Sequence, residues 1–174
     1  MKFRLIALVA AALLLFNACK KDKSTPTTTN NKYDGKYRME GTLTDHHDGS
    51  FVWPGNTYLY NLVTTSPTQI KLVSIDLGID GHLLRNGINL TFYGTFGLLV
   101  NFDPATNKIT SVTNSYGQPS LNGRSAVLDP SGVNTYDPVT KKVTIKYWMD
   151  EVGITGLGGH RTSFDETWVY VGPR

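Results

Sequence analysis

Three short segments contain residue types that could bind metals or phosphate. The segment 45–48 reads Asp-His-His-Asp, but neighbouring side chains on an extended chain point to opposite sides, whereas a metal needs converging ligands. The segment 76–81 resembles a calcium loop only faintly, because it lacks an oxygen ligand at the third position and the flanking helices, and Gly87 stands where the bidentate Glu should be. The glycine-rich segment 153–159 has no following helix to complete a phosphate site. We therefore predict no metal and no cofactor, and we interpret 45–48 as a solvated turn and 153–159 as a loop.

Two acidic pairs, Asp150-Glu151 and Asp165-Glu166, are the candidates for carboxylate catalysis. On a strand the side chains of adjacent residues diverge, whereas a glycosidase needs two carboxylates that face each other across a cleft. The sequence has no Gly-x-Ser-x-Gly elbow of a serine hydrolase. We therefore predict no catalytic residues and expect that the protein is not an enzyme.

Aromatic residues are the third group with functional potential, with nine Tyr, seven Phe and three Trp. Most are expected in the core. Four lie in loops or on predicted polar faces and are candidate ligand-binding residues: Trp53, Tyr58, Tyr60 and Trp148. Trp53 precedes a Pro-Gly-Asn loop that offers little to bury it, although for this residue we favour packing within the loop over ligand binding. Trp148 lies on the polar side of its strand. Flat rings beside polar groups suit sugars, whose C–H faces stack and whose hydroxyls need polar partners.

The charge distribution argues against a nucleic-acid partner. The chain has 17 basic and 14 acidic residues, but five of the basic residues and one acidic residue precede residue 32. Residues 32–174 therefore carry 12 basic and 13 acidic side chains, a net charge near −1. Nucleic-acid binding needs basic residues clustered on the folded surface, so we predict that no nucleic acid is bound.

Residues 1–18 have the features of a secretion signal. Two basic residues precede an apolar run, residues 5–16, which is too short to span a membrane as a helix. The segment ends at Ala18, directly before Cys19, the only cysteine of the chain, which therefore cannot form an internal disulfide. This arrangement resembles a bacterial lipoprotein signal. The resemblance implies that Cys19 is lipidated and becomes the mature N-terminus, so that acyl chains hold the protein on a membrane.

Residues 19–31 are predicted to form the lipidated Cys19 and a flexible tether. The segment after the cysteine is polar and has almost no apolar surface to bury. A flexible linker of a dozen residues would place the domain roughly 20 Å from the lipid. Asp22 resembles the acidic signals that direct Bacteroidetes lipoproteins to the outer face of the outer membrane. We expect a lipid-anchored outer-membrane protein on the cell surface, with the periplasmic leaflet as the alternative.

Residues 32–174 are predicted to form a single all-β domain. Short runs rich in β-branched and aromatic residues recur between turn signals, and no stretch of ten or more residues has helical periodicity. About eight to ten strands joined mostly by hairpins suit an antiparallel, barrel-like meander similar to a lipocalin, or a two-layer sandwich. The barrel is favoured, because it would pair the first strand, residues 37–43, with the last, residues 163–171, and leave no exposed edge.

A pattern that occurs twice predicts two hairpin turns. Residues 102–110 and 136–144, which are offset by 34 positions, each contain an aromatic residue, then Asp-Pro, and then the start of a strand. Proline presets the backbone for a type I turn, and the preceding Asp carboxylate can accept N–H bonds across it. Only two copies are present, and each is a turn, so we do not interpret them as a repeat array.

Several motifs in the second half of the chain resemble a known family. They are residues 112–118, 123–126, 128–132, 146–149 and 164–174. They are similar to an uncharacterised all-β domain that ends many Bacteroidetes surface lipoproteins, encoded beside glycan-import systems of the starch-utilisation type. The resemblance implies a non-enzymatic module of a glycan-handling lipoprotein, with oligosaccharides and outer-membrane glycan-import proteins as partners.

We therefore expect a lipid-anchored, non-catalytic cell-envelope protein that helps capture or present glycans. One alternative is a lipocalin-like carrier that holds a small apolar ligand inside the barrel. Another is an accessory subunit of an outer-membrane protein complex.

Overall fold

The structure is a computed structural model that describes residues 31–47, 49–55, 58–75, 82–86, 89–92, 95–154 and 159–174. Within these ranges the chain forms twelve strands and no helix, and no helix is long and apolar enough to cross a membrane. The strands are β1 (Gly35–Asp45), β2 (Gly49–Val52), β3 (Leu59–Ser66), β4 (Gln69–Ser74), β5 (Leu83–Asn86), β6 (Asn89–Phe92), β7 (Leu98–Phe102), β8 (Ile109–Asn114), β9 (Arg124–Leu128), β10 (Thr135–Asp137), β11 (Lys142–Glu151) and β12 (Thr162–Gly172).

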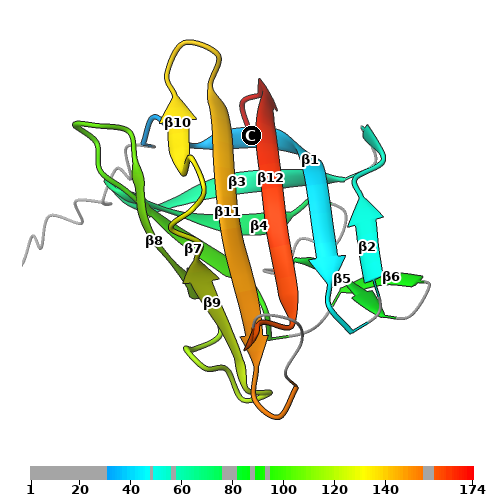
Figure 1. Cartoon of the computed structure of the whole chain (residues 1–174). Helices are drawn as coiled ribbons and strands as arrows, with labels where there is room; N and C mark the ends of the chain where they lie inside the picture. The colour runs from blue at the N-terminus through cyan, green and yellow to red at the C-terminus, as the bar shows by residue number, and fades with distance from the viewer. Residues whose placement is uncertain are drawn as a thin grey trace, which may run out of the picture.

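Ten of these strands form one antiparallel sheet that curls into a nearly closed barrel (Figure 1). The strand order is β10-β11-β12-β1-β3-β4-β7-β8, with β2 paired to β1 and β9 paired to β11. Strands β5 and β6 form a separate hairpin. The predicted all-β, barrel-like fold is confirmed.

The first and last strands pair as the sequence predicted. Strand β1 runs antiparallel to β12 from Lys36↔Gly172 to Asp45↔Thr162. On the far side of the sheet, an isolated bridge between Lys108 and Thr135 joins the start of β8 to β10. These two junctions leave the barrel with few free strand edges, which is the physical reason for closing a sheet.

Alternation of inward and outward side chains sets the core. In β11, Val143, Ile145, Tyr147 and Met149 are buried, and the residues between them are half-buried on the outside. The largest fully buried side chains of the domain are Trp168, Tyr33, Tyr37, Tyr60, Tyr147, Phe96 and Phe164. Their bulk fills the interior of the described barrel, as side chains do in small barrels.

Both Asp-Pro turns have the predicted geometry. Asp103 accepts N–H and O–H bonds from Ala105 and Thr106 at 2.9 and 2.6 Å. Asp137 accepts the equivalent bonds from the residues two and three positions later, at 2.9 and 2.6 Å. These bonds lower the pKa of both carboxyl groups, with the threonine hydroxyl as the largest cause in each.

Two short strands were not predicted, and several predictions lie outside the described residues. Strands β2 and β10 have four and three residues, too few for an alternating pattern to stand out in the sequence. The leader and the tether up to residue 30, the segment 76–81 and the glycines 156 and 158 are outside the described residues.

Candidate functional site

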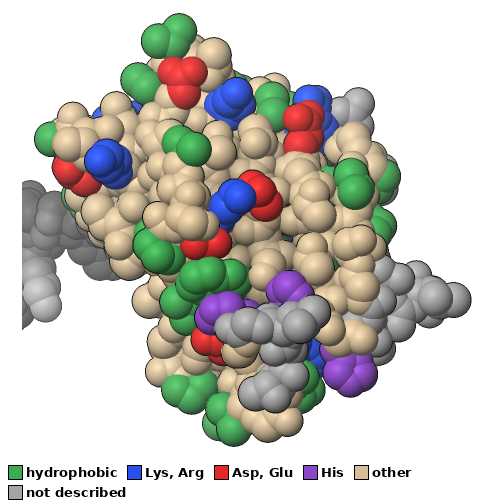
Figure 2. All heavy atoms as spheres, in the orientation of Figure 1, with side chains coloured by type: hydrophobic (Ala, Val, Ile, Leu, Met, Phe, Trp, Pro, Cys, Tyr) green, Lys and Arg blue, Asp and Glu red, His purple; other side chains and the backbone are tan. Residues whose placement is uncertain are grey.

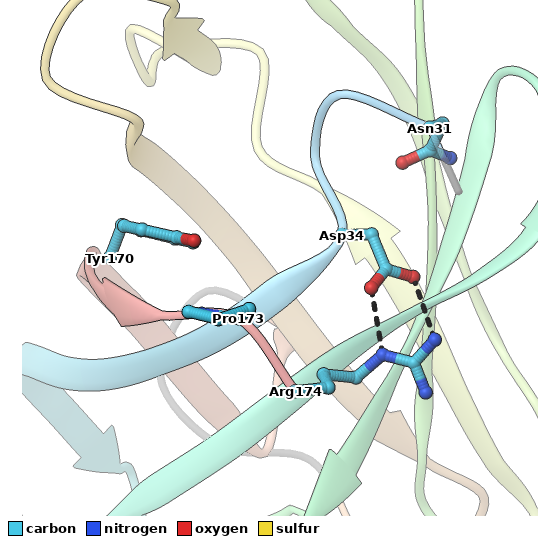
Figure 3. A pocket seen from close by; sticks show the side chains of 5 residues that line it. All are labelled: Asn31, Asp34, Tyr170, Pro173 and Arg174. Carbon is cyan, nitrogen blue, oxygen red and sulfur yellow. Dashed lines mark hydrogen bonds and ion pairs between the residues drawn. The ribbon is translucent and has the colours of Figure 1, made fainter. Parts of the chain in front are cut away.

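Two surface hollows are candidates for a binding site. The larger, with a volume of about 450 Å³, is lined by Asn31, Asp34, Tyr170, Pro173 and Arg174. Figure 3 shows that Asp34 and Arg174 point toward each other across it. Arg174 donates to both Asp34 oxygens, at 2.7 and 3.1 Å. The strongest charges of this hollow are therefore paired with each other.

The smaller hollow contains one of the predicted ligand-binding residues, and we call it the Trp148 groove. Its volume is about 350 Å³, and it is lined by Thr42, Thr44, Asp129, Lys146, Trp148, Ser163, Phe164 and Asp165. These residues come from β1, β11, β12 and the segment after β9. The groove therefore lies on the outer face of the barrel, where three adjacent strands expose their polar sides.

Trp148 forms an aromatic wall of this groove. It follows the buried Tyr147 on β11, so the strand period directs its indole outward, as predicted. The ring is half-buried and stacks on the imidazole of His160, with centroids 4.0 Å apart and planes inclined by 5°. His160 Nδ1 lies 2.6 Å from Asp150 Oδ1. One face of the indole is thus supported by a neighbour that is itself held by a carboxylate, which fixes the orientation of the ring.

Polar groups line the rest of the groove. Lys146 Nζ donates to Asp165 Oδ2 at 2.8 Å, and the pKa of Lys146 is raised by this hydrogen bond and by the charge of Asp165. Ser163 Oγ lies 2.7 Å from His46 Nε2. Hydroxyl, ammonium and carboxylate groups therefore line the same groove as the indole, a combination that can hold the hydroxyls of a ligand while the ring packs on its apolar face.

The segment after β9 is fixed against β11 and brings Asp129 to the groove. The N–H of Asp129 donates to Lys146 O at 3.0 Å. Asn134 Oδ1 accepts from the N–H of Lys146 at 2.8 Å, and its amide donates to Asp129 O at 2.6 Å. A Cβ at Gly132 would lie 2.7 Å from Lys146 Cβ. The loop packs so closely on Lys146 that only glycine fits there.

The surface view shows the same grouping of side chains. Figure 2 looks onto the face formed by β11 and β12, where basic and acidic side chains meet near the centre. Hydrophobic and histidine side chains lie together directly below them. This face combines opposite charges with apolar surface over a short distance.

The structure places the other three predicted ligand-binding residues away from Trp148. Trp53 is 5% exposed and Tyr60 is 1% exposed, whereas Tyr58 is half-buried against the core. Trp53 packs edge-on against Tyr58, with ring centroids 5.2 Å apart. The expectation that Trp53 has little to bury it is wrong, because its ring turns into the barrel beside His82, 5.8 Å away. Neither Trp53 nor Tyr60 offers a ring face at the surface.

A buried polar cluster in the barrel was missed by sequence reasoning. His82 Nε2 lies 2.6 Å from the hydroxyl of Tyr147 and 3.1 Å from Glu166 Oε1. Glu166 Oε2 accepts from the Tyr147 hydroxyl at 3.1 Å and from Trp168 Nε1 at 2.8 Å. Glu166 shares the inward side of β12 with Phe164 and Trp168. In the sequence, a carboxylate at a position where the alternation of the strand expects an apolar residue could have indicated this buried cluster.

Aromatic rings surround this cluster and isolate it from water. The imidazole of His82 lies within 6.5 Å of five rings, those of Trp53, Tyr60, Phe96, Tyr147 and Phe164. Burial raises the pKa of Tyr147 well above 10, and the charge and hydrogen bond of Glu166 add to the effect. The cluster therefore stabilises the interior through mutual hydrogen bonds, and its burial separates it from ligands in solution.

The segment 45–48 is only partly the solvated turn that was predicted. His47 is exposed, but Asp45 is 1% exposed and lies 3.7 Å from Arg161 Nε. Arg161 also pairs with Glu151 at 2.6 Å, and Arg124 pairs with Glu151 at 3.1 Å. The prediction is corrected for Asp45, which belongs to an ion-pair chain that fills one end of the barrel. Among the residues described, no group of three acidic, histidine or cysteine side chains could hold a metal.

The adjacent acidic pair on β12 diverges as predicted. Asp165 is exposed beside Lys146, and Glu166 is buried in the interior.

Comparison of the chain with family models, curated proteins and solved structures finds no match.

Proposed function

We propose that the protein is a lipid-anchored, non-catalytic component of the cell envelope that captures glycans in the Trp148 groove. The observation that carries the proposal is the half-buried indole of Trp148, stacked on His160 and bordered by hydroxyl, ammonium and carboxylate groups. A sugar has apolar C–H faces and many hydroxyls, so it needs this combination of a flat ring and oriented polar atoms. The volume of about 350 Å³ is at the lower end of the range for small-molecule sites, which suits a short segment of a glycan.

The ordered environment of the groove supports a binding role. Each polar wall is held by an internal contact: Asp165 by Lys146, Ser163 by His46 and Asp129 by the N–H of Ser131. A preorganised site loses less conformational entropy on binding. The same contacts engage the carboxylates structurally, which favours binding over acid–base catalysis.

The proposed location rests on the leader and on the polar segment that follows it. Cys19 directly after Ala18, at the end of an apolar run, supports lipidation. The resemblance to C-terminal domains of surface lipoproteins supports the outer membrane and glycan-import proteins as partners. The carrier alternative has less support, because Trp168, Tyr147 and Phe164 fill the described interior.

The test is calorimetric titration with a panel of neutral oligosaccharides: gluco-, xylo-, manno- and galacto-oligomers. We expect at least one to bind, and Trp148→Ala to weaken that binding by about tenfold or more, because loss of a stacked aromatic surface costs about 1.4 kcal/mol or more. Trp148→Phe retains a ring and is expected to retain part of the affinity.

Tyr116→Ala is the matched control, because Tyr116 is an aromatic residue with 42% exposure outside the groove. It is expected to leave the affinity unchanged. An absence of binding across the panel, or an equal loss in the Trp148 and Tyr116 variants, would contradict the proposal.

A further inference from the structure

Five lysines gather at the end of the barrel where the described chain begins. They are Lys32, Lys36, Lys108, Lys141 and Lys142, and we call this surface the lysine end. The contacts between their segments place them together. Lys32 Nζ donates to Pro104 O at 3.0 Å in the β7–β8 turn, and Tyr136 next to the β10–β11 turn donates to Lys32 O. Lys36 pairs with Gly172 at the end of β12.

The lysine end has an excess of positive charge. None of the ion pairs in the described part of the chain involves Lys36, Lys108, Lys141 or Lys142. The nearby carboxylates Asp103 and Asp137 interact electrostatically with Lys32 and Lys142, so that five lysines face two negative charges. Asp34 and Arg174 form a pair with each other, as Figure 3 shows. The rest of the domain has more acidic than basic side chains, since residues 32–174 as a whole have a net charge near −1.

The chain before residue 31 joins the barrel at this same end. Asn31 donates to Ser66 O and Gln69 O at the β3–β4 turn, and its N–H donates to Thr64. Eleven residues separate Asn31 from Cys19, and three of them are lysines. Twelve peptide steps reach at most about 40 Å when fully extended. An anchor at Cys19 therefore keeps the lysine end within about 40 Å of the lipid surface.

We propose that the lysine end docks on the phosphate-bearing headgroups of the membrane that holds the Cys19 anchor. The inference goes beyond glycan capture and rests on the proposed anchor. In this orientation β11, which begins at Lys142, leads away from the lipid, and Trp148 stands about 20 Å along the strand. The groove stays open to solvent. Basic residues near an anionic membrane each add to the attraction, and their excess here favours the docked orientation by about 30-fold or more at low salt.

The test uses the full chain after processing, incorporated into vesicles of phosphatidylcholine with or without phosphatidylglycerol. A water-soluble amine-reactive reagent labels lysines, and mass spectrometry gives the labelling rate at each position. We expect labelling of Lys36, Lys108, Lys141 and Lys142 to slow by about tenfold or more with phosphatidylglycerol. Lys146, in the groove, is expected to react equally in both vesicles. High salt should remove the protection, because it shortens the range of the attraction between exposed charges to a few ångströms.

A pair of variants with equal net charge separates local from global electrostatics. Lys141→Gln/Lys142→Gln is expected to abolish protection of Lys36 and Lys108. The control, Leu121→Asp/Asn122→Asp, changes net charge equally at the opposite end, where Leu121 is 98% exposed, and should keep the protection. Equal loss in both variants would refute a specific surface.

Other outcomes also decide the question. Equal labelling in the two vesicles overturns the docking proposal even if sugars bind in the groove. Protection by inorganic phosphate with phosphatidylcholine alone would indicate a site for the free ion instead of a membrane surface. Failure of the chain to float with either vesicle, with no palmitate incorporated at Cys19, would refute both the anchor and the docking while leaving the sugar titration to stand by itself.

Discussion

Replacement of Glu166 tests the buried cluster that sequence reasoning missed. In Glu166→Ala, the Tyr147 hydroxyl and Trp168 Nε1 lose the acceptor that now lies 3.1 and 2.8 Å away, and His82 loses the carboxylate at 3.1 Å. Each hydrogen bond to a charged group contributes about 1.5–3 kcal/mol, and the buried donors are left unpaired. We expect the free energy of unfolding to fall by about 2–6 kcal/mol, because each of the two buried donors left without an acceptor costs about 1–3 kcal/mol.

Glu166→Gln separates the effect of charge from that of shape. Glutamine keeps the volume and one oxygen that can accept from Tyr147 and Trp168, but it places an NH₂ group where Glu166 Oε1 now lies 3.1 Å from His82 Nε2. We expect a smaller loss, about half of that in the alanine variant. The order wild type, Glu166→Gln, Glu166→Ala therefore follows the number of contacts that survive.

Urea unfolding followed by tryptophan fluorescence measures these differences, and the slope against urea shows whether the unfolded state is comparable. The control is Asp165→Ala on the same strand, where loss of the solvent-exposed ion pair with Lys146 is expected to change the free energy of unfolding far less. A double-mutant cycle with His82→Ala should give a coupling of about 0.5–3 kcal/mol. A loss below about 1 kcal/mol in Glu166→Ala, or no coupling to His82, would refute the buried cluster as described.

Two further predictions concern the groove loop and the Asp34–Arg174 pair. Gly132→Ala would place a Cβ 2.7 Å from Lys146 Cβ, so we expect the free energy of unfolding to fall by about 1–3 kcal/mol and sugar binding to weaken. Ser131→Ala is the control. Unchanged sugar binding in Gly132→Ala would contradict the prediction. Burial raises the pKa of Asp34, but hydrogen bonds from Arg174 and Thr64 outweigh burial and hold this pKa below its ordinary value of 3.8. The pair therefore adds stability that is fully present well above pH 3.8 and is lost as pH falls through the folded-state pKa. Asp34→Asn should show a smaller decrease in unfolding free energy below pH 3.8 than the wild type, and identical acid profiles would contradict this assignment.

The sequence by itself determined the features that depend only on residues close to one another along the chain. Alternation of side chains along a strand follows from a period of two, so Trp148 could be placed on the outer face before the fold was known. The Asp-Pro turns followed from the fixed proline backbone and the reach of a carboxylate over two or three residues. The recurrence of short strands between turn signals and the lack of helical patterning predicted the all-β class, and closure of such a meander favoured a barrel that pairs its first and last strands over a sandwich.

Only the tertiary structure decided which distant side chains meet. Barrel closure brings His82 to Tyr147, 65 residues away, and Asp34 to Arg174, 140 residues away. The burial of Trp53 has the same origin, since a ring in a loop is exposed or buried according to the sheet beneath it. Pairing partners at such separations depend on sheet curvature and register, which are set by the packing of the whole core and leave no signal in a short stretch of sequence.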